Sequence, residues 1–162
     1  MSEAIQAVVL GASGYVGGEL LRLISSHPSF QLAAAVSDSR AGTRVADTFA
    51  HLSAALPDTE FVGREDWHGT VAAGSKLALF SAAPHGASAA VIAGALEMAK
   101  QKDWTIHVVD SSADFRYAEQ SAWESVYGAA HGAPELLGQF TSTLPEHADS
   151  VATPHIGHPG CF

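Results

Sequence analysis

Hydrophobic and polar positions divide the chain into short apolar runs and longer segments with helical spacing. The apolar runs are typical of buried strands and cover residues 5–10, 31–36, 77–81 and 105–109. Apolar residues at helical spacing predict helices over residues 15–26, 88–100 and 118–126. Weaker patterns indicate further strands over residues 59–62 and 153–156, the last one weakened by Pro154. Residues 128–138 read as a loop with a short turn.

This alternation of strands and helices is typical of an α/β protein. It predicts a parallel sheet wound with helices on both faces, a Rossmann-type doubly wound fold with right-handed connections. Ligands of such sheets bind at the carboxyl ends of the strands. The loops that follow the predicted strands are therefore where candidate binding residues are sought.

Composition narrows the class of protein. With 162 residues, 47% of them hydrophobic and 15% charged, the chain is long enough for one domain with a core of its own. A formal net charge of -9 argues against binding to nucleic acid. The apolar runs are too short for a membrane span, and Met1-Ser2-Glu3-Ala4 does not resemble the start of a secretory signal. One cysteine cannot form an internal disulfide, so we expect a cytoplasmic protein.

A glycine-rich loop directly follows the first predicted strand and opens the first helix. Its spacing is G-x-x-G-x-x-G, a variant of the dinucleotide-binding fingerprint. Glycines permit the tight turn and let backbone amides approach a pyrophosphate at the positive end of a helix. The alternative is a turn that is tight for structural reasons only. The candidate cofactor-binding residues of this loop are Gly11, Ser13, Gly14, Tyr15, Val16 and Gly17.

The end of the second strand bears on which nucleotide is bound. The sequence there is Ser37-Asp38-Ser39-Arg40, where an NAD enzyme usually carries an acidic residue that bonds the ribose. Small hydroxyls, with Arg40 placed to meet a 2′-phosphate, favour NADP. Asp38 favours NAD, unless its side chain points to water. Ser37 and Arg40 are therefore the candidate contacts of an NADP 2′-phosphate.

The single cysteine, Cys161, follows Pro159-Gly160. If a helix begins at Cys161, its free amides and dipole stabilise a thiolate and hold an oxyanion, as attack on an acyl carbon requires. The alternative is a cysteine that serves as a small buried hydrophobic residue. The nucleotide-binding loop upstream favours the nucleophile.

Two further segments follow predicted strands. His85, in Pro84-His85-Gly86, lies on the side of the sheet where ligands bind. Arg116 is placed to bind a phosphate or a carboxylate, unless it pairs with Asp110 or Asp114, which are candidate caps or turn residues. None of the nine histidines has a convincing ligand spacing with a second cysteine or an acid, so no metal site is expected.

In this order, these segments resemble the N-acetyl-gamma-glutamyl-phosphate reductase family of the semialdehyde dehydrogenase superfamily. The glycine loop is shared with many enzymes, whereas Ala113-Asp114-Phe115-Arg116 and Pro159-Gly160-Cys161 are more specific. The resemblance runs along essentially the whole chain. The matching segments are residues 11–20, 84–88, 110–116, 123–124, 127–128, 134–136 and 159–161.

The resemblance implies an activity. NADPH would reduce N-acetyl-L-glutamyl 5-phosphate, a small-molecule acyl phosphate, to the 5-semialdehyde in arginine biosynthesis. Cys161 would displace phosphate and form a thioester. Arg116 would contact an anionic group of the substrate. The residues expected near the nicotinamide are Pro84, His85 and Gly86.

The chain also departs from the family. His158 stands where the family usually has Asn, Phe162 where it usually has Tyr, and residues 127–136 diverge. In the family the chain continues into an α+β domain that carries the catalytic base and the subunit interface. We therefore expect residues 1–158 to form the dinucleotide-binding domain and residues 159–162 to begin the catalytic segment. The base is expected beyond Phe162, and the full-length protein is expected to form a homo-oligomer.

Two alternatives stay open. One is another acyl-phosphate reductase of the superfamily, such as aspartate-semialdehyde dehydrogenase, which shares the glycine loop and the thioester chemistry. The other is an NADP-binding module without catalysis. Two measurements distinguish these hypotheses. One compares the activities on N-acetylated and free-amino substrates, and the other is the effect of changing Cys161.

Overall fold

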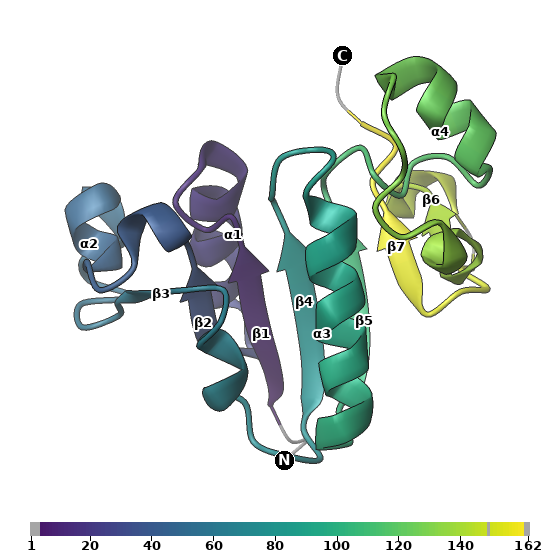
Figure 1. Ribbon diagram of the computed structural model, residues 1–162. Helices are drawn as coiled ribbons and strands as arrows, with labels where there is room; N and C mark the ends of the chain where they lie inside the picture. The colour runs from purple at the N-terminus through teal and green to yellow at the C-terminus, as the bar shows by residue number, and fades with distance from the viewer. Residues whose placement is uncertain (1–3, 149, 161–162) are drawn as a thin grey trace.

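A seven-stranded parallel sheet forms the centre of the molecule (Figure 1). The computed structural model describes residues 4–148 and 150–160. The strand order is β3-β2-β1-β4-β5-β7-β6, and every neighbouring pair is parallel. The strands are β1 (Ile5–Leu10), β2 (Phe30–Val36), β3 (Phe61–Val62), β4 (Lys76–Ser81), β5 (Thr105–Asp110), β6 (Phe140–Ser142) and β7 (His155–Gly157). This confirms the predicted α/β class and the parallel sheet.

Helices cover both faces of the sheet (Figure 1). Helix α1 (Tyr15–Ser26) lies on one face and α3 (Ser88–Lys102) on the other. Because successive side chains of a strand point to opposite faces, β1 contributes to two cores. Val8 and Leu10 pack in the cluster that includes α3, and Ala7 and Val9 pack in the cluster that includes α1. The chain leaves β1 toward β2 and returns on its other side as β4, so the strand order reverses between β1 and β4.

The helix boundaries follow local sequence signals. Helix α1 ends at Ser26, two residues before Pro28, because the residue before a proline is pushed out of the helical region. Helix α3 ends at Lys102, and Asp103 caps it in the left-handed conformation at φ 54°. Helix α4 covers Gln120–Tyr127, close to the predicted 118–126, and Gly128 caps it.

Several short elements were not predicted. Among them are α2 (Val45–Thr48), strand β6 and a 3-10 helix over Pro134–Gln139. They are short, so no periodic pattern marks them in the sequence. The predicted strand over residues 153–156 is β7, which begins one residue after Pro154. The predicted strand over residues 59–62 is reduced to the two residues of β3.

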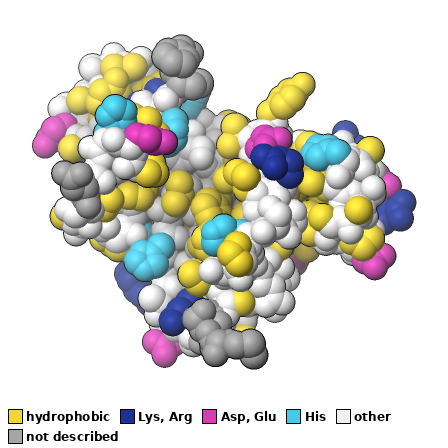
Figure 2. Space-filling view, turned by 180° about the vertical axis from the view of Figure 1, so that it is seen from behind, with side chains coloured by type: hydrophobic (Ala, Val, Ile, Leu, Met, Phe, Trp, Pro, Cys, Tyr) yellow, Lys and Arg dark blue, Asp and Glu magenta, His cyan; other side chains and the backbone are white. Residues whose placement is uncertain are grey.

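On the face that Figure 2 shows, Lys and Arg side chains form no extended positive patch. Among the described residues, four ion pairs join Lys or Arg side chains to acidic ones, and three of these pairs link residues three apart in sequence. A bound anion must therefore be held by a local site. None of the described helices has both the length and the apolar content that crossing a membrane requires.

Candidate functional site

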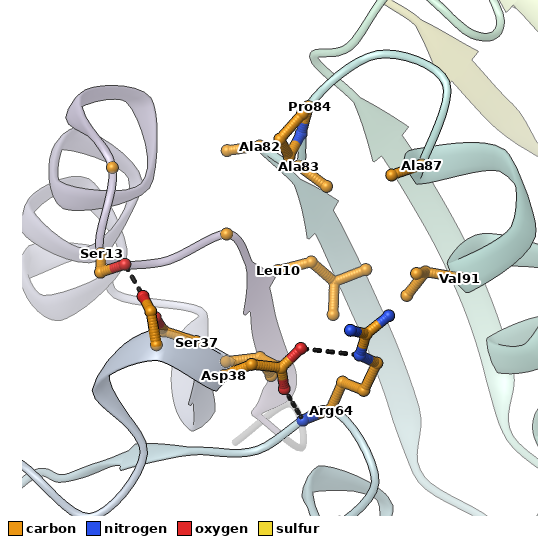
Figure 3. A pocket seen from close by; sticks show the side chains of 14 residues that line it. Leu10, Ser13, Ser37, Asp38, Arg64, Ala82, Ala83, Pro84, Ala87 and Val91 are labelled. Atoms are coloured by element: carbon orange, nitrogen blue, oxygen red, sulfur yellow. Dashed lines mark hydrogen bonds and ion pairs between the residues drawn. The ribbon is translucent and has the colours of Figure 1, made fainter.

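A cavity of about 460 Å³ opens at the carboxyl ends of β1, β2 and β4, where the strand order reverses (Figure 3). Ligands of open parallel sheets bind at this place. The wall comes from the ends of three strands and from the start of α3. The lining residues are Leu10, Gly11, Ser13, Gly14, Val36, Ser37, Asp38, Ser39, Arg64, Ala82, Ala83, Pro84, Ala87 and Val91. We call this the first cavity.

The glycines of the loop between β1 and α1 serve different purposes. Gly11 has φ +68°, and a Cβ there would lie 2.6 Å from the Ala82 carbonyl oxygen at the end of β4. A Cβ on Gly17 would overlap the backbone of Gly11 and Ala12. Both positions therefore need glycine for the loop to fold. A Cβ on Gly14 would meet only the Gly11 carbonyl oxygen, at 3.5 Å, which is an ordinary contact.

Gly14 lines the first cavity and is the N-cap of α1. A helix begins with amides that have no partner inside the helix, and a glycine cap has no side chain to bond them. These first-turn amides belong to Tyr15, Val16 and Gly17. Tyr15 is 98% exposed and Val16 is also exposed. The loop thus offers free donors and an open approach, which is what a pyrophosphate needs.

Serine hydroxyls lie beside the loop. Ser13 Oγ lies 2.8 Å from Ser37 Oγ, and Ser37 Oγ lies 3.4 Å from Ser39 Oγ. The backbone holds the two segments together, because the Ala12 amide donates to the Val36 carbonyl at 2.9 Å. Figure 3 shows Ser13 and Ser37 facing each other across the gap between the loop and β2. These hydroxyls are suited to bind a phosphate or a ribose.

The charged residues that line the first cavity are Asp38 and Arg64. The Arg64 backbone N–H donates to Asp38 Oδ1 at 2.8 Å, and its Nε–H donates to Oδ2 at 2.7 Å. The backbone hydrogen bond from Arg64 is the main cause that lowers the pKa of Asp38, and burial opposes it. Asp38 is half-exposed and also paired with Arg64, so its side chain does not face water alone.

Arg64 was not among the residues proposed from the sequence. It follows β3, a two-residue strand, so no local motif marks it. Arg40 is exposed and does not line the first cavity. Its carbonyl instead accepts bonds from the Thr43 amide and hydroxyl, which close the turn after the 3-10 helix Asp38–Arg40. The predicted contact of Arg40 with a 2′-phosphate stays a prediction.

A second cavity, of about 420 Å³, lies beside the first. Ala82 and Ala83 line both cavities, so the two are neighbours across the loop after β4. The second cavity is also lined by Val16, His85 and Arg116, which were proposed from the sequence as pyrophosphate, nicotinamide and substrate contacts. The other lining residues are Ser111, Ser112, Ala113 and Tyr127. The structure thus brings His85 and Arg116 to one cavity.

Two buried aspartates hold this region together. Asp114 accepts the Gly86 amide at 2.7 Å and the Ala89 amide at 2.9 Å, so it ties the Pro84–Gly86 loop and the start of α3 to the segment after β5. Asp110 accepts the hydroxyls of Ser88 and Ser112. Burial raises the pKa of Asp110, and these hydrogen bonds oppose it. Both aspartates are thus structural, as turn and cap residues are.

Arg116 pairs with neither aspartate within hydrogen-bond range. Its Nη1–H donates to the Tyr127 hydroxyl at 3.0 Å, while its buried Nε–H has no partner among the described residues. Gly160 packs against the guanidinium, where a Cβ would lie 2.7 Å from Nη2. Arg116 therefore lies between the second cavity and the Pro159-Gly160 turn that precedes the cysteine.

His158 takes over the hydrogen bonding that an asparagine supplies in such turns. Its Nδ1 accepts the Gly160 amide, two residues further on, at 3.0 Å. An Asx side chain makes the same bond to the backbone two residues on. The His158 amide donates to the Asp110 carbonyl at 2.8 Å and anchors the turn to β5. Cys161 and Phe162 lie outside the described residues, so the predicted nucleophile stays a prediction.

Comparison with known proteins shows the family of this chain. A family model described as the semialdehyde dehydrogenase NAD-binding domain matches residues 6–140. The chain belongs to the semialdehyde dehydrogenase NAD-binding domain family. The glycine loop and the first cavity lie within the matched residues, as does Arg116.

Among the relatives that are similar to this chain in sequence are proteins named N-acetyl-gamma-glutamyl-phosphate reductase. The protein of Salinispora tropica is 40% identical over 98% of this chain and 43% of its own length. The protein of Thermobifida fusca is 39% identical over 96% of this chain and 42% of its own length. This chain thus spans about two fifths of the length of these curated relatives.

A solved semialdehyde dehydrogenase shares the fold. The crystal structure of aspartate semialdehyde dehydrogenase with NADP from Candida albicans superimposes with a TM-score of 0.57 at 18% identity. The match covers 81% of this chain and 41% of the other. Within residues 4–148 and 150–160, no group of three or more His, Cys, Asp or Glu side chains is placed to hold a metal ion.

Proposed function

We propose that this chain is the NADPH-binding part of an acyl-phosphate reductase that acts on N-acetyl-L-glutamyl 5-phosphate. The observation that carries the proposal is Gly14. It has no packing reason to be glycine, it lines the first cavity, and it opens a helix whose amides are free to bind a pyrophosphate. Relatives named N-acetyl-gamma-glutamyl-phosphate reductase, 36% to 40% identical along nearly all of the chain, support the substrate.

The residues of the first cavity fit a dinucleotide. The amides of Tyr15 and Val16 would hold the pyrophosphate, and the Ser13 and Ser37 hydroxyls would bind the phosphorylated ribose. The Ser37 and Ser39 hydroxyls after β2, the Ser13 hydroxyl beside them and Arg64 after β3 favour NADP over NAD. Pro84, His85 and Gly86 would flank the nicotinamide, between the two cavities. Bound there, NADPH supplies a hydride.

The chain itself supplies the group that accepts the acyl moiety. The Cys161 thiolate would attack the acyl carbon, a carbon–sulfur bond would form, and the carbon–oxygen bond to phosphate would break. Inorganic phosphate leaves with the electron pair of that bond. The resulting thioester is more easily reduced to an aldehyde than a carboxylate is, and the thiolate is released in that reduction. Arg116, beside Gly160, would hold an anionic group of the substrate.

A second candidate is a related acyl phosphate. A relative in Aeropyrum pernix, named as a putative [LysW]-L-2-aminoadipate/[LysW]-L-glutamate phosphate reductase, is 36% identical over 90% of this chain and 38% of its own length. The same first cavity and cysteine would serve that reaction. The acyl group would then be presented on a carrier rather than as a free metabolite.

The activity is tested with the full-length protein purified from its native cell. We expect that protein to be cytoplasmic and homo-oligomeric. NADPH formation is followed in the reverse direction, with phosphate, NADP and either N-acetyl-glutamate semialdehyde or aspartate semialdehyde. We expect turnover of the first and not the second. Preference for aspartate semialdehyde would contradict the proposed substrate.

The Cys161→Ser variant tests the nucleophile. We expect it to lose turnover and to keep NADPH binding, because the first cavity is built from residues 10–91. Retained turnover would contradict the assignment of Cys161. NADPH binding by the wild type, with no turnover of any semialdehyde and no effect of the variant, would indicate a binding module without catalysis.

A further inference from the structure

The pair Asp38–Arg64 lies near the end of β2, where enzymes of this fold distinguish NAD from NADP. Asp38 is two residues beyond the end of β2, and in this fold an acidic side chain near that strand end bonds the ribose hydroxyls of NAD. The pair lines the first cavity together with Ser37 and Ser39. A free carboxylate there would repel a 2′-phosphate. The pairing with Arg64 therefore decides what charge the bound nucleotide meets.

Arg64 has N–H donors that Asp38 does not accept. Asp38 takes up the backbone N–H and the Nε–H of Arg64. A guanidinium has five N–H donors, and the four on its two terminal nitrogens are not used by Asp38. Figure 3 shows the guanidinium extending between Asp38 and Val91, along the wall of the first cavity. Held by the carboxylate on one edge, it presents its other nitrogens in a fixed orientation.

The pair is also open to solvent. The side chains of Arg64 and Asp38 are 57% and 49% exposed. Exposed ion pairs add little to stability, so this one is poorly explained as a stabilising contact. Phosphate recognition by arginine, in contrast, gains from forked geometry and from charge.

We infer that Arg64 is the specificity-determining residue of the first cavity: it neutralises Asp38 and offers its terminal nitrogens to the 2′-phosphate of NADP. Asp38 is then a positioning residue that orients Arg64. Without Arg64, the unpaired Asp38 would repel the 2′-phosphate and bond the ribose hydroxyls of NAD instead. This inference rests on the proposed dinucleotide binding and assigns a role that the sequence prediction gave to Arg40.

The test measures the dissociation constants of NADPH and NADH by nicotinamide fluorescence for the wild type and for Arg64→Gln. We expect Arg64→Gln to weaken NADPH binding by about tenfold or more and to leave NADH binding equal or tighter. Arg64→Lys keeps the charge but loses the fork, so an intermediate loss is expected. Asp38→Asn should weaken NADPH by a smaller factor and should not tighten NADH.

The matched control is Arg44→Gln. Arg44 forms a similar exposed pair with Asp47 and does not line the first cavity, so its loss should leave both dissociation constants unchanged. Circular dichroism of each variant verifies the fold. An unchanged ratio of NADPH to NADH affinity in Arg64→Gln would overturn the inference, as would a loss of NADPH preference in Arg40→Gln alone. A wild type that binds neither nucleotide would overturn the proposed function as well.

Discussion

The two neighbouring cavities are built in different ways. Backbone and small side chains at strand ends form most of the first cavity, and its glycine-loop residues Gly11, Ser13 and Gly14 lie close together in sequence. The second cavity gathers His85, Arg116 and Tyr127, which come from three separate segments. The buried Asp114 carboxylate ties the segment of Arg116 to Gly86 and Ala89, which are 28 and 25 residues away in sequence, and Arg116 in turn donates to the Tyr127 hydroxyl.

This difference separates two sources of specificity. A site made of amides and glycines recognises a shape that many proteins share, a pyrophosphate at a helix N-terminus. A site made of charged and aromatic side chains from distant segments recognises one substrate. Changes in the glycine loop should therefore affect folding and cofactor binding, and changes near Asp114 should affect the substrate side. The following variants test that division.

The largest effect is expected for Gly17→Ala. Its Cβ would overlap the backbone of Gly11 and Ala12, which no side-chain movement relieves. We expect a loss of more than about 3 kcal/mol of unfolding free energy, measured by urea denaturation. The control is Gly94→Ala on α3, where a Cβ meets nothing within 4 Å and a gain of about 0.5 kcal/mol is expected. Equal stabilities of the two variants would contradict the assigned packing.

A smaller loss is expected for Asp114→Ala. It leaves the part-buried Gly86 amide and the buried Ala89 amide without their acceptor, at a cost of about 2–4 kcal/mol. Hydrogen exchange at these two amides should quicken, while the Ala12 amide, bonded to the Val36 carbonyl, keeps its protection. The control is Asp58→Ala, since Asp58 is exposed. Equal loss of protection at Ala12 would show that the two regions are not separable.

The same division explains what the sequence could predict. β1, α1, β4, α3 and β5 follow from apolar periodicity, and the glycine loop follows from its spacing after a strand. Arg64 and the partners of Asp114 could not be predicted, because tertiary contacts place them. β6 has three residues, and the isolated bridge Arg44–Glu60 has one pair, so neither leaves a period in the sequence.

The smallest of these stability effects concerns pH. Burial, and then the charge of His107, lower the pKa of His155 from its ordinary 6.5, and His155 Nδ1 accepts the Val108 amide in place of a strand bond. The folded state thus favours neutral His155, whereas the unfolded chain gains a proton below about pH 6.5. Stability should fall as the pH is lowered from 6.5 toward the depressed pKa of the folded state.

Thermal denaturation at pH 7.5 and at lower pH measures this dependence for the wild type and for His155→Gln, which keeps an acceptor but does not titrate. On acidification the melting temperature of the wild type should fall further than that of His155→Gln. His51→Gln is the control, because His51 is exposed. An equal loss in the wild type and in His155→Gln would exclude His155 as the cause.

We ascribe the glycine at position 14 to close contact with a bound dinucleotide, because packing within the chain leaves room for a Cβ there. The direct measurement is NADPH binding by Gly14→Ala, followed by nicotinamide fluorescence. Its φ of -83° suits alanine and its Cβ has room, so the unfolding free energy should change by less than about 1 kcal/mol. We expect an intact fold with NADPH affinity reduced by about tenfold or more. An intact fold with unchanged NADPH affinity would contradict this assignment.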